Sequence, residues 1–393
     1  MNNIYLNIDQ YLKHQMSSGL AITFGNDKNI QYIYKGRKNE DDNINGINQF
    51  VNENTLFDLS SVSKFFTLII VMKCVENGIL NLKDKIAVCD PRFIHLGQLS
   101  IEDILSYQVE IRTSSRIENC QNIKEVEELL LNATYLENKG IYSDLPAMIL
   151  KMIVEHVTSY KFYDLIKEWI LETCQMKNTF IHIPECRVQD CISNNYEMRI
   201  VNNQLIVFDN ILPGVCNDGK ARLFHDNEFA GHAGLFSTIQ DMGKLCQCFL
   251  NEKLLKKETI EQISINRTGT KIDENKYTKY FGYLCYVKHP VRRDSEVHPL
   301  LSDNAFAFGG YTGNQLTIDF NNKVFLFMAA NRCHHRVTQI IPISDIDKYV
   351  KEEGEKEYIY FDDQKYLYSK NFVYKRDDYV INPIVEYLIK NKE

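Results

Sequence analysis

The sequence has no dense run of lysine and arginine interleaved with aromatic residues, the pattern that follows a phosphate backbone. Its 45 lysine and arginine residues are outnumbered by 52 aspartate and glutamate residues, which gives a formal net charge of −7. We therefore expect no nucleic acid partner. No apolar run reaches the ~18 residues that a membrane span requires, since FFTLIIVM stops at Lys73. We therefore expect no transmembrane segment.

The first residues, MNNIYLNIDQYLKHQM, lack the basic region and the following apolar stretch of a secretory signal. The eleven cysteines are odd in number and irregularly spaced from Cys74 to Cys333. Cys246 and Cys248 form a C-x-C inside a helical pattern, which matches neither a zinc site nor a C-x-x-C redox motif. These features predict free, buried thiols in a reducing compartment, and hence a cytoplasmic protein.

The sequence also has no internal repeat and no low-complexity linker. Residues 20–24 and 30–35 are β-rich runs on either side of GNDKN, a turn by composition. After about residue 275, β-branched and aromatic runs typical of strands occur again, in YFGYLCYV, NQLTID and KVFLFMAAN. Helical patterns dominate the middle of the chain, where Ser100 and Asp103 stand at capping-box spacing and Pro146 falls in a first turn.

This order of elements predicts an α/β (α+β) fold, in which both chain ends form one antiparallel sheet flanked by helices. A largely helical subdomain is inserted between the two ends. In residue numbers, we expect one domain over 1–336, with sheet regions at about 1–60 and 275–336 and the helical subdomain at about 80–240. Residues 337–393 are expected to form an extension packed on the same domain, with a tyrosine-rich hairpin or mobile flap and a terminal helix.

Ser61 and Lys64 form an S-x-x-K pattern where an apolar run begins that predicts a buried helix. Positions i and i+3 share a helix face, so the Lys64 ammonium can reach the Ser61 hydroxyl. A lysine can take a proton from serine only if burial lowers its pKa, and Phe65 and Phe66 offer an apolar site for this. The Ser61 N–H could also face a developing oxyanion. By itself, S-x-x-K equally fits a serine cap followed by a surface lysine.

LFDLSSVSKFFT resembles the first motif of the serine β-lactamase and penicillin-binding-protein superfamily, particularly its class C-like branch of serine hydrolases and esterases. Tyr142, Ser143 and Asp144 resemble the second motif, Tyr-x-Asn or its Tyr-Ser-Asp variant. SIEDILSYQVEI is similar to the segment between these motifs, with Tyr107 where the family commonly has histidine. FHDNEFAGHAGLFSTIQDM and FAFGGYTGNQLTIDFNN resemble later segments. The matches run in family order over roughly residues 18–336.

The resemblance implies roles for individual residues. Ser61 corresponds to the acylated nucleophile, and Lys64 to the lysine that accepts or relays its proton. Tyr142 corresponds to the tyrosine that shares this work and protonates the leaving group. Whether the lysine or the tyrosine is the base remains open. Asp144 is expected at the substrate-binding side of the cleft, and the fold places this cleft between the sheet and the helical subdomain.

The third motif departs from the family pattern. The family commonly has Lys-Thr-Gly or His-Thr-Gly, and the corresponding residues here are Phe308, Gly309 and Gly310. The two glycines suit close approach of substrate to the strand, and the Tyr311 N–H is expected to be the second oxyanion donor. Because Phe308 carries no charge, we expect it to bind substrates without a free carboxylate at the scissile site.

Several histidines are candidate metal ligands by residue type. His225 with Asp226, then His232, could supply donors, and His334 with His335 could add more. None of these residues has the i, i+4 spacing of a helical metal site. We therefore expect no metal, and the sequence indicates no other cofactor.

The sequence thus predicts a serine hydrolase that acts through an acyl-serine intermediate on a small ester, amide or peptide. One alternative is a cytoplasmic biosynthetic peptidase, acyltransferase or cyclase that acts on a peptide intermediate. A second alternative is a non-catalytic binding protein that kept the fold. The combination of Ser61, Lys64 and Tyr142 argues against this second alternative. The sequence leaves the substrate and the oligomeric state open.

Overall fold

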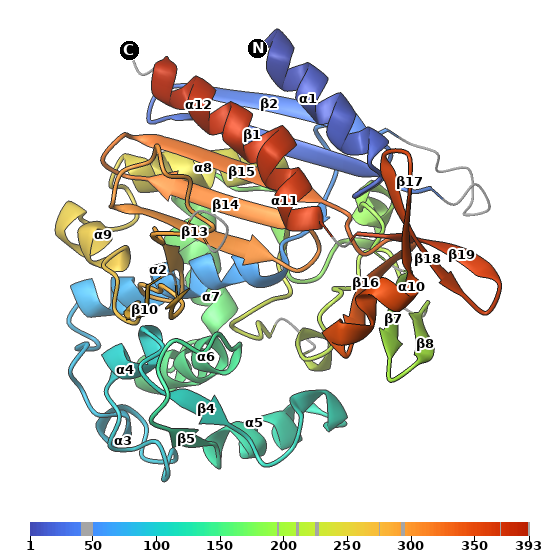
Figure 1. Cartoon of the computed structure of the whole chain (residues 1–393). Coiled ribbons are helices and arrows are strands. Elements are labelled where there is room, and N and C mark those ends of the chain that lie inside the picture. The colour runs from blue at the N-terminus through green and yellow to red at the C-terminus, as the bar shows by residue number, and fades with distance from the viewer. Residues whose placement is uncertain are drawn as a thin grey trace.

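The structure is a computed structural model, which describes residues 1–40, 50–194, 196–209, 212–224, 228–274, 276–291, 295–369 and 371–391. Strands from both ends of the chain form a central antiparallel sheet in the order β12-β13-β14-β15-β1-β2 (Figure 1). This confirms the predicted fold class. The strands are β1 Gly19–Asn26, β2 Ile30–Gly36, β12 Tyr286–Val287, β13 Ala305–Gly310, β14 Asn314–Asp319 and β15 Val324–Ala330.

The hairpin between β1 and β2 turns where the sequence predicts it. The side-chain oxygen of Asn26 accepts hydrogen bonds from the backbone N–H groups of Lys28 and Asn29, at 2.9 and 2.8 Å. An asparagine that bonds its own following backbone stabilises such a turn locally. The prediction of a strand throughout YFGYLCYV is wrong, because the Gly282 N–H bonds back to the Cys285 carbonyl and only the last two residues join the sheet.

Helices cover both faces of the central sheet. Successive side chains of a strand point to opposite faces, and Leu20 and Ile22 of β1 accordingly lie in one core while Ala21 lies in the other. The helices α1 Asn2–Lys13, α11 Phe372–Arg376 and α12 Asn382–Lys390 lie across the first face (Figure 1). The opposite face carries α2 Lys64–Glu76 and α8 Ile239–Leu250. The predicted terminal helix is therefore confirmed.

The inserted subdomain is largely helical, as predicted. The α4 helix begins with a capping box in which Ser100 and Asp103 bond each other's backbone N–H groups, and Pro146 lies in the first turn of α6. The subdomain comprises α3 Ile86–Cys89, α4 Ile101–Leu105, α5 Ile123–Leu131, α6 Leu145–Thr158 and α7 Phe162–Ile166, with the strand pair β4 Glu110–Arg112 and β5 Thr134–Leu136. Residues Lys167–Glu172 continue α7 as a π-helix.

A second six-stranded sheet was not predicted. It has the order β17-β18-β19-β16-β7-β8, and Figure 1 shows it beside the carboxyl-terminal end of β13. Its strands are β7 Glu197–Val201, β8 Gln204–Phe208, β16 Arg336–Ile341, β17 Val350–Glu353, β18 Lys356–Phe361 and β19 Gln364–Tyr368. The tyrosine-rich segment thus forms hairpins, the first of the two predicted alternatives. The β7–β8 hairpin shows that the middle of the chain is less uniformly helical than predicted.

Shorter elements complete the described chain. They are β3 Phe57–Asp58, β6 Thr179–Phe180, β9 Phe236–Ser237, β10 Lys271–Asp273, β11 Lys276–Tyr277, α9 Lys257–Ile263 and α10 Ile346–Tyr349. All eleven cysteines are free thiols, as predicted, and all but Cys120 and Cys186 are buried. Within the described ranges, no helix combines the length and the apolar character that crossing a bilayer requires.

Candidate active site

Ser61 and Lys64 lie side by side at the start of α2. Residues Ser60–Ser63 form a 3₁₀ turn, and the α-helix proper begins at Lys64. This turn places positions i and i+3 above one another, and Lys64 Nζ lies 2.9 Å from Ser61 Oγ. The Lys64 side chain is fully buried, with no exposed area. The reading of this pattern as a serine cap followed by a surface lysine is therefore wrong.

Lys64 also contacts the second motif. Its Nζ donates to Tyr142 Oη at 2.9 Å and to Asp144 Oδ1 at 2.7 Å. Tyr142 and Asp144 lie in the loop that leads into α6, which begins at the next residue, Leu145. An ammonium group has three N–H donors. The contacts with Ser61, Tyr142 and Asp144 therefore account for all three of them.

The charge state of Lys64 differs from the one predicted. Burial disfavours its ammonium form, as the sequence argument assumed, but the Asp144 carboxylate and the Tyr142 hydroxyl outweigh burial. The pKa of Lys64 is therefore raised rather than lowered. The argument from Phe65 and Phe66 considered only the apolar neighbours of Lys64, whereas the decisive carboxylate belongs to a residue 80 positions away.

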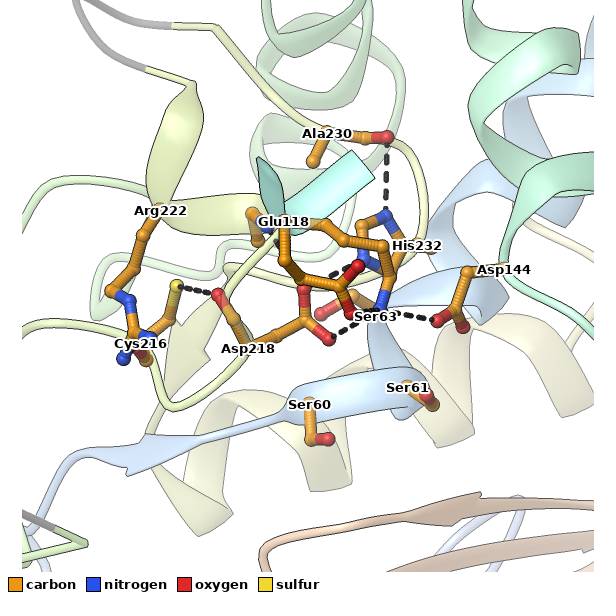
Figure 2. Close-up of polar contacts among 12 residues, drawn as sticks. Ser60, Ser61, Ser63, Glu118, Asp144, Cys216, Asp218, Arg222, Ala230 and His232 are labelled. Carbon is orange, nitrogen blue, oxygen red and sulfur yellow. Dashed lines mark hydrogen bonds and ion pairs between the residues drawn. The ribbon is translucent and has the colours of Figure 1, made fainter. Parts of the chain in front are cut away.

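Asp144 belongs to a larger network of charged groups. Its second carboxylate oxygen lies 3.2 Å from Lys220 Nζ, which is also 3.4 Å from Asp218 Oδ2. His232 Nε2 lies 2.9 Å from Asp218 Oδ1. Figure 2 shows Asp144, Asp218 and His232 together beside the segment that carries Ser61. Burial raises the pKa of Asp144, but Lys64, His232 and Lys220 together hold it well below the usual range.

The same group resembles a metal site in its composition. Ligand atoms of Asp144, Asp218 and His232 all lie within 4.8 Å of one another. Lys64 and Lys220 already place two ammonium groups against these carboxylates. A divalent cation would have to compete with both of them. We therefore assign the group to the ion-pair network around Lys64.

The other histidines considered from the sequence lie away from this group or outside the described chain. His225 and Asp226 lie outside the described residues. His334 is buried, with Nε2 at 2.8 Å from Asn39 Oδ1, and its ring packs against the ring of His335 at 4.3 Å between centroids. The contacts of His334 therefore explain it as a packing residue.

Aromatic rings position Tyr142. Its ring stacks on Tyr286 at 5.7 Å between centroids and on Phe281 at 6.1 Å. Tyr107, where relatives commonly have histidine, lies 5.9 Å from the Tyr142 ring and is fully buried. Its hydroxyl has no hydrogen-bond partner among the described residues. The sequence did not identify Tyr286 or Phe281 as neighbours of Tyr142, because nothing in their spacing links them to the second motif.

At the edge of the central sheet, the third motif is only partly where the sequence placed it. Gly309, Gly310 and Tyr311 line the cavity beside Ser61. A side chain added at Gly309 would meet nothing within 4 Å. Phe308 is only 2% exposed and packs against Phe65, with 5.4 Å between ring centroids. The predicted substrate-binding role of Phe308 is therefore wrong, because its side chain points into the core.

The two predicted oxyanion donors, the backbone N–H groups of Ser61 and Tyr311, differ in their hydrogen bonds. The Ser61 N–H has no acceptor among the described residues. The Tyr311 N–H donates to Ser60 Oγ at 3.1 Å and so points toward the residue next to Ser61. Figure 2 shows Ser60 and Ser61 as neighbours on the same turn. The donors of an oxyanion hole must point at one common position, and the pairing of the Ser61 and Tyr311 N–H groups in such a hole stays a prediction.

The cavity beside Ser61 has a volume of about 980 Å³. Its walls come from the helical subdomain, the edge of the central sheet, and the second sheet, which contributes Val201, Ile206 and Phe208. It carries charged side chains of both signs, which are Arg116, Glu118, Asp144, Glu197, Arg199, Asp218, Lys220, Arg222, Glu296, Arg332 and Arg376. The cavity can therefore hold a molecule that has both polar and apolar parts.

Arg199 and Arg332 both lie near the Tyr311 ring, with Cζ at 5.4 and 5.3 Å from its centroid. Arg199 pairs with Glu197 at 2.6 Å. Arg332 has no ion pair with any described residue, and it donates only to the carbonyls of Tyr311 and Thr338, at 3.4 and 3.3 Å. Its Nε is buried and has no hydrogen-bond partner in the part of the chain that the structure describes. No sequence pattern distinguishes Arg332 from the other basic residues.

Comparison with known proteins places these features in context. The chain matches the family model described as Beta-lactamase over residues 7–340. A Salmonella typhimurium protein named "Putative D-alanyl-D-alanine carboxypeptidase" is 26% identical over 322 residues, and the match covers 72% of this chain and 71% of that protein. A second protein with this name, from Salmonella typhi, matches to the same extent.

Solved structures share the fold. EstCE1, described as a hydrolase with promiscuous acyltransferase activity, superposes with a TM-score of 0.66 at 16% identity and covers 84% of this chain and 93% of its own. The octameric penicillin-binding protein homologue from Pyrococcus abyssi superposes with a TM-score of 0.62 at 16% identity. The match covers 84% of this chain and 73% of the homologue. Simvastatin synthase from Aspergillus terreus superposes with a TM-score of 0.63 at 13% identity. The match covers 84% of this chain and 91% of the synthase.

Proposed function

The chain belongs to the beta-lactamase family, and we propose that it is a serine hydrolase that forms a covalent acyl ester on Ser61. One observation carries the proposal. Ser61 Oγ, Lys64 Nζ and Tyr142 Oη form a continuous chain with 2.9 Å between neighbouring atoms. A nucleophile and the groups that move its proton must be within this distance of each other.

In the acylation step, Ser61 Oγ attacks the carbonyl carbon of an ester or amide, and a C–O bond forms. The hydroxyl proton passes into the Lys64–Tyr142 pair. The N–H groups of Ser61 and Tyr311 would stabilise the negative charge that develops on the carbonyl oxygen. When the tetrahedral intermediate collapses, the bond to the leaving group breaks and the pair returns the proton to that group. Water then repeats the sequence on the acyl ester and releases the acid.

Asp144 controls the protonation of this network. The Asp144 carboxylate, 2.7 Å from Lys64 Nζ, favours the charged form of Lys64 in the resting site. The base that accepts the Ser61 proton is either a neutral Lys64 or a Tyr142 phenolate, and each of these states has one proton fewer than the resting network. Asp144 opposes the loss of that proton because its carboxylate attracts the cation. The proposed mechanism therefore predicts an activity that rises with pH.

The substrate is proposed to be a small ester, amide or peptide. The sequence argument for a substrate without a free carboxylate rested on Phe308, which lies in the core. Arg332, which lines the cavity without an ion pair among the described residues, offers a partner for a negative group instead. A guanidinium and a carboxylate form strong, often bidentate hydrogen bonds. We therefore assign the substrate a carboxylate that faces Arg332.

Two alternative functions differ from the proposed hydrolase in what happens after the substrate binds. An acyltransferase, peptidase or cyclase with a biosynthetic role would use the same acyl–Ser61 ester, and an amine or alcohol could replace water in the second step. A binding protein would keep the cavity without turnover. The free cysteines suit a reducing compartment, and on this basis a cytoplasmic site of action remains our prediction.

A panel of p-nitrophenyl esters and D-peptide amides tests the proposal, with turnover and thermal melting measured for wild type and Ser61→Ala. We expect turnover in wild type and none in Ser61→Ala, with unchanged melting, because the hydroxyl alone forms the covalent bond. Ser344→Ala, an exposed serine far along the chain, is the matched control and should retain full activity. Ser61→Ala activity within about tenfold of wild type would remove Ser61 from the mechanism.

A further inference from the structure

Ser60, which directly precedes the proposed nucleophile, has an unusual backbone conformation. Its φ is 49°, in the left-handed region that residues with a Cβ seldom adopt. Its N–H donates to Asp58 Oδ1 at 2.8 Å, and this bond helps to hold the conformation. Ser60 is 5% exposed, so its neighbours enclose it. A glycine would adopt this conformation without strain, which raises the question of what the Ser60 hydroxyl contributes.

The hydroxyl of Ser60 is the acceptor for the Tyr311 N–H, with 3.1 Å between the two atoms. Tyr311 is the residue whose N–H is proposed as the second oxyanion donor. The first proposed donor, the Ser61 N–H, has no acceptor among the described residues. The two donors therefore differ in the resting site, because one is open and the other is occupied.

A backbone N–H has a single hydrogen, so a strong, nearly linear bond to one acceptor excludes an equally strong bond to a second. A carbonyl oxygen in the oxyanion hole must lie about 2.7–3.1 Å from both donors. Ser60 Oγ already lies at that distance from the Tyr311 nitrogen, and two oxygens cannot share this position without steric overlap. We infer that the Ser60 hydroxyl occupies the oxyanion hole in the resting site and must rotate away before Ser61 is acylated.

This inference rests on the proposed acyl-serine function and adds a positioning residue to it. Rotation of the Ser60 side chain about Cα–Cβ breaks the hydrogen bond from the Tyr311 N–H but moves no backbone atom. The hydroxyl thus gives the Tyr311 N–H a partner until the substrate provides one, since a buried donor without an acceptor is costly. The Ser60 hydroxyl also makes acylation of Ser61 slower than it would be with an unoccupied oxyanion hole.

The test compares wild type with Ser60→Ala and Ser60→Gly. The probe is a fluorophosphonate, whose P=O oxygen must enter the same hole when Ser61 is phosphonylated. We expect both variants to be phosphonylated faster than wild type by roughly two- to tenfold, the value of one net hydrogen bond. kcat/KM for a p-nitrophenyl ester should rise by a similar factor. An unchanged or slower rate in both variants would overturn the inference, and a slower rate would make Ser60 a donor to the oxyanion.

The matched control is Ser17→Ala, which removes another buried serine hydroxyl, one that donates to the Tyr11 hydroxyl at 3.2 Å. Its phosphonylation rate should equal that of wild type. Ser60→Gly also removes the Cβ that disfavours φ 49°, so it should melt at or above the temperature of Ser60→Ala and remains available if the alanine variant folds poorly. Wild type that is never labelled would contradict the proposed function itself. Labelled wild type with unchanged Ser60 variants would contradict only the present inference.

Discussion

Lys64 and Asp144 form an ion pair in which 2.7 Å separate Nζ from Oδ1, and the lysine side chain is fully buried. This pair joins the first and second motifs across the cleft and fixes the charge on the group nearest Ser61. It also replaces the mechanism expected from the sequence, in which burial alone would have made Lys64 a base. The predictions below test what this pair, and the groups around it, do.

Asp144→Asn should shift the acidic limb of the kcat/KM profile to lower pH. Asp144 raises the pKa of Lys64, and without its charge burial becomes the main influence, which lowers that pKa. The proton-poor state of the network then forms at lower pH, whether Lys64 or Tyr142 is the base. We expect a shift of roughly 1–3 pH units, typical of a close opposite charge.

Steady-state kinetics across the accessible pH range, with Asp9→Asn as the matched variant, would measure this shift. Asp9 forms a surface ion pair with Lys35 at 2.9 Å, so its substitution removes a carboxylate without touching the cleft. Its pH profile should coincide with that of wild type. A profile of Asp144→Asn that also coincides would mean that the ion pair does not control the reacting proton.

Lys64→Arg should be nearly as damaging as Lys64→Ala. A guanidinium keeps the positive charge opposite Asp144 but cannot give up its proton at working pH. If Lys64 moves a proton, both variants should lose about 10²-fold or more in kcat. Substantial activity in the arginine variant, measured beside the alanine variant, would restrict Lys64 to an electrostatic role.

Arg332→Gln should weaken the preference for a substrate with a free carboxylate. A charge-assisted hydrogen bond contributes roughly 1.5–3 kcal/mol, so kcat/KM for the free acid should fall about tenfold or more. The matched methyl ester should be affected little. A wild type that prefers the methyl ester would show that Arg332 does not bind the substrate charge.

Asp218→Asn should lower the free energy of unfolding at neutral pH. The free energy of unfolding of the variant should also fall less than that of wild type when the pH is lowered. Burial raises the pKa of Asp218, but His232 and Lys220 hold it well below the usual range. A carboxylate with a depressed folded-state pKa stabilises the fold above its unfolded pKa of ~3.9, and this contribution is lost as pH falls through the folded value.

Urea unfolding at pH 7, 5 and 3 would measure this effect. The free energy of unfolding of Asp218→Asn should lie roughly 1–3 kcal/mol below that of wild type at pH 7, because the substitution breaks a partly buried charge network. The difference should shrink at pH 3. A difference that stays constant from pH 7 to pH 3 would show that the Asp218 charge is not what stabilises the network.

Local patterns in the sequence predicted much of this architecture. The turn at Asn26, the capping box at Ser100 and the one-turn spacing of Ser61 and Lys64 each depend on residues a few positions apart. Such relationships are fixed by the backbone and can be read without the fold. The resemblance then located Tyr142, because the motif order carries information that one tyrosine among 23 does not.

The features that the sequence did not predict depend on contacts between distant segments. The pKa of Lys64 follows from Asp144, and the cap on the Tyr311 N–H comes from a residue 251 positions earlier. The motif position alone predicts Phe308 in the cleft, whereas side chains alternate between the two faces along β13 and that of Phe308 points into the core. The second sheet pairs β7 with β16 across more than a hundred residues, and no local pattern predicts that pairing.

Mass spectrometry of the intact protein, quenched in acid during turnover of p-nitrophenyl acetate, tests the central claim most directly. The account predicts one acetyl group per chain, located by peptide mapping on Ser61, and no such adduct in Ser61→Ala. Turnover that continues in Ser61→Ala, or an acetyl group that maps to another residue while hydrolysis proceeds, would contradict it.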